Sequence, residues 1–205
     1  MQKNEAIQEL KELYIKKMCG VAFVESNQLL YAQGDTIHTL NDKIKHCHLC
    51  ARRKLSNPII GYIKPESKVV FVVEKPFFMS DKNQELIDSR RTRKLKSFAY
   101  ETLGLRDFSL LSLLKCGGEE LSNQEQTHLC RPYLQEQLSG LRAKVVIVFD
   151  AYVSHAMGIE SKIGYRTLWH NKHILTTYPL IDILRNPALE GEVYKHFMSI
   201  KNFLG

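Results

Sequence analysis

The sequence predicts an α/β domain with a mainly parallel central sheet flanked by helices, and three observations lead to this prediction. Residues 68–73 and 144–149 are short, continuous apolar runs rich in β-branched residues, as in the buried strands of a parallel sheet. Stretches with helical periodicity separate these and the other strand candidates. Strands that alternate with helices indicate a sheet with helices on both faces.

The composition is that of one folded domain. The 205 residues suffice for one full domain and are few for two, and the hydrophobic share of 44% is typical of globular proteins. No apolar run approaches the roughly 18–20 residues of a membrane span, and the N-terminus lacks the apolar core of a signal peptide. We therefore expect a cytoplasmic protein with reduced thiols and no membrane partner. We expect residues 1–39 to form a helical extension of the same globule and residues 40–205 to form the α/β domain.

The charge favours a polyanionic partner. The formal net charge is +7 and the pI is about 9.1, and basic residues cluster at 52–54 and 90–96. Such a balance is typical of proteins that bind nucleic acid. A basic protein without such a partner has the same composition, so charge alone leaves both interpretations open.

The elements can be placed in order from periodicity and from stop signals. An amphipathic helix is expected first, closed near Gly20, and a last helix closes the chain. A capping-box pattern at Ser122 to Glu125 predicts where one central helix begins. The expected helices are 4–17, 40–50, 84–103, 122–138, 151–157 and 192–204, and the expected strands are 68–73, 109–114, 144–149 and 173–178.

Four of the five cysteines form a pattern with metal-binding chemistry: Cys47, Cys50, Cys116 and Cys130. A Cys-x-x-Cys pair brings two thiolates to one centre, and two further cysteines complete a four-thiolate site for zinc or an iron–sulfur cluster. A zinc ribbon usually has a second tight pair, which this chain lacks, so the spacing favours iron–sulfur. A redox-active pair, or buried cysteines without a ligand, stay open as alternatives.

Cationic residues follow the first cysteine pair directly. Arg52, Arg53 and Lys54 would lower the pKa of neighbouring thiols and so favour metal ligation. The same side chains could contact phosphates or form an ordinary charged surface.

The carboxyl ends of the predicted strands mark the expected binding crevice, because parallel sheets bind ligands there. Three segments should meet at this edge: residues 74–78, 112–116 and 178–180. The sequence contains neither a phosphate-binding Gly-rich loop nor a His-Glu-x-x-His helix.

The order of these motifs resembles the iron–sulfur uracil-DNA glycosylases, the family-four branch of that superfamily. Members of that branch have a Cys-x-x-Cys near the N-terminus, a Gly-Glu-Ala-Pro-Gly turn after a strand, and an Asn-x-x-Lys-Cys motif. A further cysteine lies in the next helix, and a Thr-x-His-Pro-type motif precedes Leu-Leu-Arg. The counterparts here are Cys47 with Cys50, residues 73–77, residues 112–116, Cys130 and residues 176–185.

The resemblance extends from about Leu40 to the C-terminus and implies several properties. It implies a 4Fe-4S cluster on the four cysteines that serves structure and DNA contact rather than redox chemistry. It implies DNA as a partner, with Arg185 joining Arg52, Arg53 and Lys54 as expected DNA contacts. It also implies that the target nucleotide leaves the duplex and enters a pocket.

The sequence departs from the family at the residues that handle uracil. The late-motif His, which stabilises the departing uracil anion, is Tyr178, or Pro179 in the alternative alignment, and a neutral phenol offers no cationic imidazole. The base-reading Asn is Ser112, which is too short for the paired contact. The two turn glycines are Val73 and Phe77, and Phe77 would narrow the space that glycine leaves for a ligand.

Glu74 and Pro76 of the family turn remain in the sequence. Glu74 could orient a water molecule or cap the next helix. We therefore predict a pocket with Glu74 and Tyr178 as catalytic candidates and with Pro76, Phe77, Ser112 and Pro179 as substrate-binding candidates.

Three functions remain open at this point. The first is a cluster-containing DNA-binding relative whose uracil excision is lost or altered. The second is an active glycosylase for uracil or another damaged base that uses Tyr178, Glu74 or a histidine such as His170 or His173. The third is a docking subunit that binds replication or repair proteins.

Overall fold

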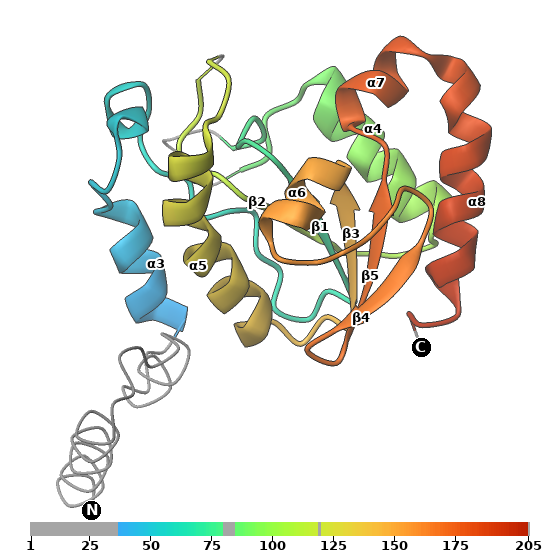
Figure 1. The fold of residues 1–205 in the computed structure, drawn as a ribbon. Coiled ribbons are helices and arrows are strands. Elements are labelled where there is room, and N and C mark those ends of the chain that lie inside the picture. The colour runs from blue at the N-terminus through green and yellow to red at the C-terminus, as the bar shows by residue number, and fades with distance from the viewer. Residues whose placement is uncertain (1–36, 80–84, 119, 205) are drawn as a thin grey trace, which may run out of the picture. The chain divides into compact units, whose positions relative to one another are not determined.

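The computed structural model describes residues 37–79, 85–118 and 120–204 (Figure 1). The chain divides into two compact units, Met1–Leu40 and Asn41–Gly205. The predicted helix at residues 4–17 and Cys19 lie outside the described residues. Whether residues 1–39 belong to the same globule therefore stays a prediction. No helix in the described ranges is long and apolar enough to cross a bilayer.

A five-stranded sheet forms the centre of the second unit, in the order β2-β1-β3-β5-β4 (Figure 1). Four strands run parallel: β1 (Val69–Val73), β2 (Ser109–Ser112), β3 (Val145–Phe149) and β5 (Lys172–Thr177). Strand β4 (Arg166–Trp169) pairs antiparallel with β5. The prediction of a mainly parallel sheet is confirmed.

Strand β4 was not predicted, because it lacks the continuous apolar run of the other strands. Its residues alternate between exposed and half-buried, as expected at the edge of a sheet. It is joined to β5 by His170 and Asn171, which both have positive φ. Positive φ at both residues of a two-residue connection is typical of a type I′ hairpin turn.

Helices cover both faces of the sheet. On one face lie α4 (Arg90–Ser97), its π-helical continuation Phe98–Thr102, α7 (Leu180–Arg185) and α8 (Glu190–Lys201). On the other face lie α5 (Gln124–Gly140) and α6 (Ala151–Ala156). A helix α3 (Ile37–Lys45) and two 3₁₀ turns, Ala51–Lys54 and Pro187–Leu189, complete the described elements.

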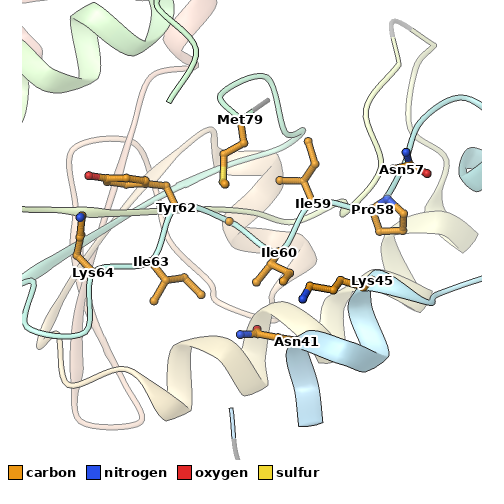
Figure 2. A pocket seen from close by; sticks show the side chains of 11 residues that line it. Asn41, Lys45, Asn57, Pro58, Ile59, Ile60, Tyr62, Ile63, Lys64 and Met79 are labelled. Atoms are coloured by element: carbon orange, nitrogen blue, oxygen red, sulfur yellow. The ribbon is translucent and has the colours of Figure 1, made fainter. Parts of the chain in front are cut away.

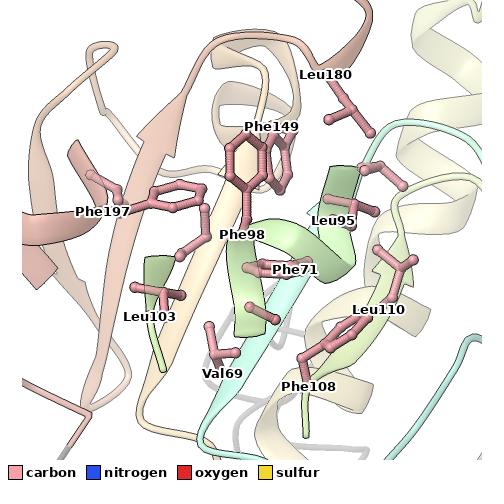
Figure 3. Close-up of a cluster of buried hydrophobic side chains, with 14 of the residues drawn as sticks. Val69, Phe71, Leu95, Phe98, Leu103, Phe108, Leu110, Phe149, Leu180 and Phe197 are labelled. Atoms are coloured by element: carbon pink, nitrogen blue, oxygen red, sulfur yellow. The ribbon is translucent and has the colours of Figure 1, made fainter. Parts of the chain in front are cut away.

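Aromatic side chains fill the core between the sheet and α4 and α8 (Figure 3). Phe71 of β1 lies at its centre, with ring centroids 5.3 Å from Phe108, 5.6 Å from Phe149 and 6.5 Å from Phe197. All residues of β1 and β3 are buried, which explains their unbroken apolar sequences.

Several helices begin at other residues than predicted, and side-chain caps explain the difference for two of them. Helix α4 begins at Arg90 rather than at residue 84, because the Ser89 side chain accepts from the Thr92 amide at 3.2 Å and forms a capping box. Helix α5 is capped by Asn123, whose Oδ1 accepts from the Gln126 amide at 2.8 Å. The hydroxyl of Ser122, the predicted cap, donates to Glu74 Oε1 instead.

Helix α3 ends at Lys45, before the first cysteine pair. The prediction that a helix at 40–50 carries Cys47 and Cys50 is therefore wrong. Both thiols lie in the irregular segment that leads to the 3₁₀ turn Ala51–Lys54. An extended Cys50, with φ −144° and ψ 167°, precedes that turn.

A segment of irregular backbone runs beside β2. Tyr62 and Leu110 exchange two backbone hydrogen bonds, at 2.9 and 2.7 Å, and the Ile59 amide donates to the Lys115 carbonyl at 2.7 Å. Gly61 has φ +131°, and a Cβ there would lie 2.6 Å from Leu111 Cδ2. This close approach requires glycine.

Candidate functional site

A cavity of about 550 Å³ opens beyond the carboxyl ends of β1, β3 and β5. This is the edge at which the sequence predicts the binding crevice. Its lining comes from the ends of three strands, from helix α4 and from the connection that precedes α5. The lining residues are Val73, Glu74, Lys75, Pro76, Phe77, Arg91, Gly118, Phe149, Asp150, Pro179, Leu180 and Ile181.

Glu74 lies in this cavity directly after β1, as predicted. Its carbonyl accepts from the Leu114 amide at 2.9 Å, which extends the pairing of β1 with the chain after β2. The Ser122 hydroxyl donates to Glu74 Oε1 at 2.6 Å. Backbone and side chain are therefore both held by the β2 side of the sheet.

Asp150 is a second carboxylate in the same cavity, and the sequence analysis missed it. It follows β3 and has φ 125°, a backbone conformation that costs a non-glycine residue about 1–3 kcal/mol. Its side chain accepts from the Tyr152 amide at 2.8 Å and so caps α6. An acidic residue directly after a buried strand was the signal that could have revealed it.

The environment of Asp150 disfavours its charged form. Burial raises the pKa of this carboxyl, and the negative charges of Glu74 and Asp182 raise it further. The hydrogen bond from the Tyr152 amide acts in the opposite direction. The cavity thus contains two carboxyl groups, and the surroundings of Asp150 favour its protonated form.

An aromatic and cationic pair forms another part of the lining. The Arg91 guanidinium lies 5.2 Å from the centroid of the Phe77 ring. Phe77 is half-buried, whereas Phe78 is fully buried in the core. The predicted substrate contacts Pro76, Phe77 and Pro179 all line the cavity, and the cavity remains open despite Phe77.

Two predicted site residues lie outside the lining in the described part of the chain. Ser112 has no exposed surface, and its Oγ finds no hydrogen-bond partner among the described residues. Tyr178 donates its hydroxyl to Glu192 Oε2 at 2.5 Å and stacks on His196, with ring centroids 5.8 Å apart. The hydrogen bond to Glu192 raises the pKa of Tyr178. Of the four residues predicted to line one crevice, Glu74 and Phe77 line the cavity, whereas Ser112 and Tyr178 do not.

The four predicted metal ligands come from three segments. Cys47 and Cys50 are half-buried, Cys116 after β2 and Cys130 in α5 are buried, and all four are free thiols. The pKa of Cys116 is raised to about 11, mainly by burial and also by the charges of the other three thiols. The pKa of Cys130 is also raised by burial, with contributions from Cys50 and Cys47. The thiols therefore lie close enough to influence one another.

Arg52 holds these cysteine segments together. Its side chain is only 1% exposed, and its guanidinium donates to the Gly117 carbonyl at 2.9 Å and the Gly118 carbonyl at 3.3 Å. It also donates to the Glu120 carbonyl at 3.3 Å and to Gln126 Oε1 at 3.4 Å. The prediction that Arg52 contacts DNA is therefore corrected: both of its terminal amino groups already bind the chain itself, and the side chain is buried.

The other predicted DNA contacts are more accessible. Lys54 and Arg185 are exposed. Arg53 is half-buried and donates to Asn57 Oδ1 at 2.7 Å. These three side chains stay candidates for phosphate contacts.

Lys115 precedes Cys116 and is a fully buried cation. Its ammonium group donates to the Ser112 carbonyl at 2.7 Å and to Gln137 Oε1 at 2.6 Å. Burial lowers the pKa of Lys115 to about 7, and the nearby Cys130 acts in the opposite direction.

The donor set can be compared with the metal groups that it would suit. The described residues contain no group of three or more His, Cys, Asp or Glu side chains arranged to hold one metal ion. A single zinc ion requires all four sulfurs at about 2.3 Å from one point. Four cysteine thiolates are a donor set that fits an iron–sulfur cluster.

A second cavity, of about 450 Å³, lies beside the irregular segment next to β2 (Figure 2). It is lined by residues 57–64, by Asn41 and Lys45 of α3, and by Met79. Asn41 Oδ1 is buried and finds no hydrogen-bond partner among the described residues. None of the predicted site residues lines this cavity.

The comparisons with known proteins agree with this architecture. The family model for the Uracil DNA glycosylase superfamily matches residues 60–199, about two thirds of the chain. The match includes the cavity, Cys116 and Cys130, and it begins after the Cys-x-x-Cys pair. No curated protein matches the sequence. The chain belongs to the uracil DNA glycosylase superfamily.

Proposed function

We propose that this protein binds DNA and releases a damaged base, with uracil as a poor substrate, and that its four cysteines hold a 4Fe-4S cluster. The observation that carries the altered activity is the content of the cavity. Glu74 and Asp150 line it, whereas Ser112 and Tyr178, at the positions of the family's base-reading Asn and late His, do not.

The two carboxyl groups suit the breaking of a glycosidic bond. The sugar becomes cation-like in the transition state, and the base leaves with negative charge unless it receives a proton. A pair of carboxyl groups in different environments can divide acid and base roles between them. Asp150, whose pKa is raised, is the candidate donor of a proton to the leaving base. Glu74, held by Ser122, is the candidate for orienting water or facing the sugar cation.

The aromatic lining suits a base taken out of the stack. Enzymes that act on an extruded base hold it by stacking on aromatic or apolar side chains. Phe77 offers such a face, the Arg91 guanidinium lies beside it, and Pro179 lines the same cavity. A cation near the ring also provides attraction for a phosphate at the mouth of the cavity.

Uracil itself finds few of the expected contacts. The Ser112 side chain is buried away from the cavity and is too short to replace an amide. Tyr178 is hydrogen-bonded to Glu192 on α8. Removing one donor that stabilises a developing anion typically lowers the rate about 10²–10³-fold. A base that leaves after protonation depends less on such a donor.

An excision assay tests this activity. Single- and double-stranded oligonucleotides that each contain one modified base, either uracil or a damaged purine or pyrimidine, are incubated with the protein and then cleaved at abasic sites. We expect at least one other base to be released faster than uracil. Efficient release of uracil in preference to every other base would overturn the proposal.

The cluster proposal is supported by the four thiols and by the buried environment of Cys116 and Cys130. Burial disfavours free thiolates, and a positively charged metal centre offsets that penalty. When bound, the cluster would supply structural cross-linking between segments. Arg52 already brings the same three segments together through its hydrogen bonds.

Iron analysis tests the cluster directly. Protein purified without oxygen should be brown and contain iron and acid-labile sulfide, and replacing Cys47, Cys50, Cys116 or Cys130 by Ser should release the metal. Cys19→Ser, the matched control, should retain it. Colourless protein with one zinc per chain would contradict the proposal.

A further inference from the structure

The connection between β2 and α5 contacts both the cysteine segments and the cavity. Its described residues are Gly117, Gly118 and residues 120–122. It begins directly after Cys116 and leads to the helix that contains Cys130. Gly118 also lines the cavity beside Glu74. One short stretch of chain thus touches two sites that are distant in the sequence.

The first contact of this connection is with the cysteine side. The Arg52 guanidinium donates to the carbonyls of Gly117, Gly118 and Glu120 at 2.9–3.3 Å. The Gly117 amide donates to Ser56 Oγ at 2.6 Å. A buried guanidinium that binds several carbonyls fixes their relative positions, because its donors form a rigid fork.

The second contact is with the cavity side. The Lys75 ammonium donates to the Glu120 carbonyl at 2.7 Å, and the Ser122 hydroxyl donates to Glu74 Oε1 at 2.6 Å. Lys75 and Glu74 are neighbours at the end of β1, and both line the cavity. The Glu120 carbonyl accepts from both Lys75 and Arg52, so it joins the two contacts.

Ser122 is available for this contact because α5 does not need it. Asn123 provides the cap, with its side chain on the Gln126 amide. Ser122 is half-buried, and its hydroxyl reaches a carboxylate instead of the helix end. At 2.6 Å this hydrogen bond is short for an O–H donor and an oxygen acceptor.

We propose that Ser122 is a positioning residue for Glu74, and that the Arg52 contacts make this position depend on the four-cysteine segments. The inference rests on the proposed function for its effect on catalysis, but the contact itself does not. Loss of the ligand on the cysteines should loosen the connection and with it the Glu74 carboxylate. The cysteine site would then act on the reaction from outside the cavity.

The test observes Glu74 directly, by NMR of full-length protein labelled with ¹³C at the glutamate carboxyl groups, with Glu74→Gln to assign its signal. Ser122→Ala should shift the Glu74 signal and leave the other signals in place. Ser139→Ala is the matched control, because in the described part of the chain the Ser139 hydroxyl binds only the Gln135 carbonyl of the same helix. A Glu74 signal that stays in place in Ser122→Ala would overturn the positioning role.

The link to the cysteines needs its own variants. Arg52→Lys keeps the charge but loses the fork, and Cys130→Ser removes one thiol. Both should move the Glu74 signal in the same direction as Ser122→Ala, with circular dichroism to show that they fold. If both fold and neither moves the signal, the dependence on the cysteine segments is wrong.

Kinetics separate this inference from the proposed function. On a substrate that is released, Ser122→Ala should lower kcat about tenfold or more while DNA binding changes less than about twofold. An unchanged kcat would refute the positioning role while the proposed function stands. If no base is released by any protein but the Glu74 signal responds to Ser122→Ala, the proposed function falls and the contact stands.

Discussion

Asp150 shows at the scale of one residue how the fold prepares a reactive group. Its backbone has φ 125°, its carboxylate caps α6, and its pKa is raised by burial and by the charges of Glu74 and Asp182. Strained backbone persists where the surroundings determine it, and such positions cluster at functional sites. The Asp150 amide also donates to the Thr177 carbonyl at 3.1 Å, which fixes the residue between two strand ends.

Replacing Asp150 by Asn should make stability less sensitive to pH. Because the pKa of Asp150 is raised, the folded protein keeps this proton up to a higher pH than the unfolded chain does. The stability that Asp150 contributes therefore falls as pH rises through that window. Asn does not titrate, still caps a helix and tolerates positive φ.

Urea unfolding measures this difference. The free energy of unfolding of Asp150→Asn, relative to the parent protein, should increase from about pH 4 to about pH 7. A relative stability that declines over this range would show that the carboxylate is stabilised in its charged form.

The residues that the sequence assigned best are those fixed by strand ends. Glu74, Pro76 and Phe77 follow β1 and line the cavity as predicted. The roles of Ser112 and Arg52 could not be predicted from the sequence, because the surroundings of a side chain depend on packing between segments that are distant in the chain. Ser112 is buried without a partner, and the guanidinium of Arg52 binds backbone carbonyls up to 68 residues away.

At the scale of elements, buried strands were easier to predict than edges and helix ends. The unbroken apolar sequences of β1 and β3 reflect burial on both faces. Strand β4 has one exposed face and no such run, so its pairing with β5 became visible only in the sheet. The cap of α5 is Asn123 rather than the predicted Ser122, whose hydroxyl binds Glu74.

Gly61 provides a test of the packing beside β2. Gly61→Ala should lower the free energy of unfolding by about 1–3 kcal/mol, because its φ is +131° and the new Cβ would meet Leu111 Cδ2 at 2.6 Å. Gly191→Ala is the control, since no described atom beyond its chain neighbours and its own helix backbone lies within 4 Å of a Cβ at this position in α8. Chemical denaturation measures the free energy of unfolding of both variants.

The control should be neutral or slightly stabilising, because alanine favours a helix more than glycine does. Equal stability of Gly61→Ala and the parent protein would mean that the segment at 57–64 can move away from β2. The second cavity, which this segment lines, would then have no fixed shape.

For the whole molecule, the sheet explains why the site could be located but not completed from the sequence. Parallel strands end at one edge, so residues after β1, β3 and β5 meet there whatever their separation in the chain. The sequence located this edge and the order of the cysteines. It did not reveal that the chain after β5 directs Tyr178 towards α8, or that β3 contributes Asp150.

The central claim is that the chemistry lies with Glu74 and Asp150 rather than with the late motif. The measurement that tests it most directly is the single-turnover rate of base release by the parent protein, Asp150→Asn and Tyr178→Phe, on the oligonucleotide whose base is released fastest. Loss of a proton donor should lower the rate about 100-fold or more in Asp150→Asn, whereas Tyr178→Phe should stay within about twofold of the parent. A rate that Tyr178→Phe abolishes and Asp150→Asn leaves intact, or no release from any oligonucleotide, would contradict the account.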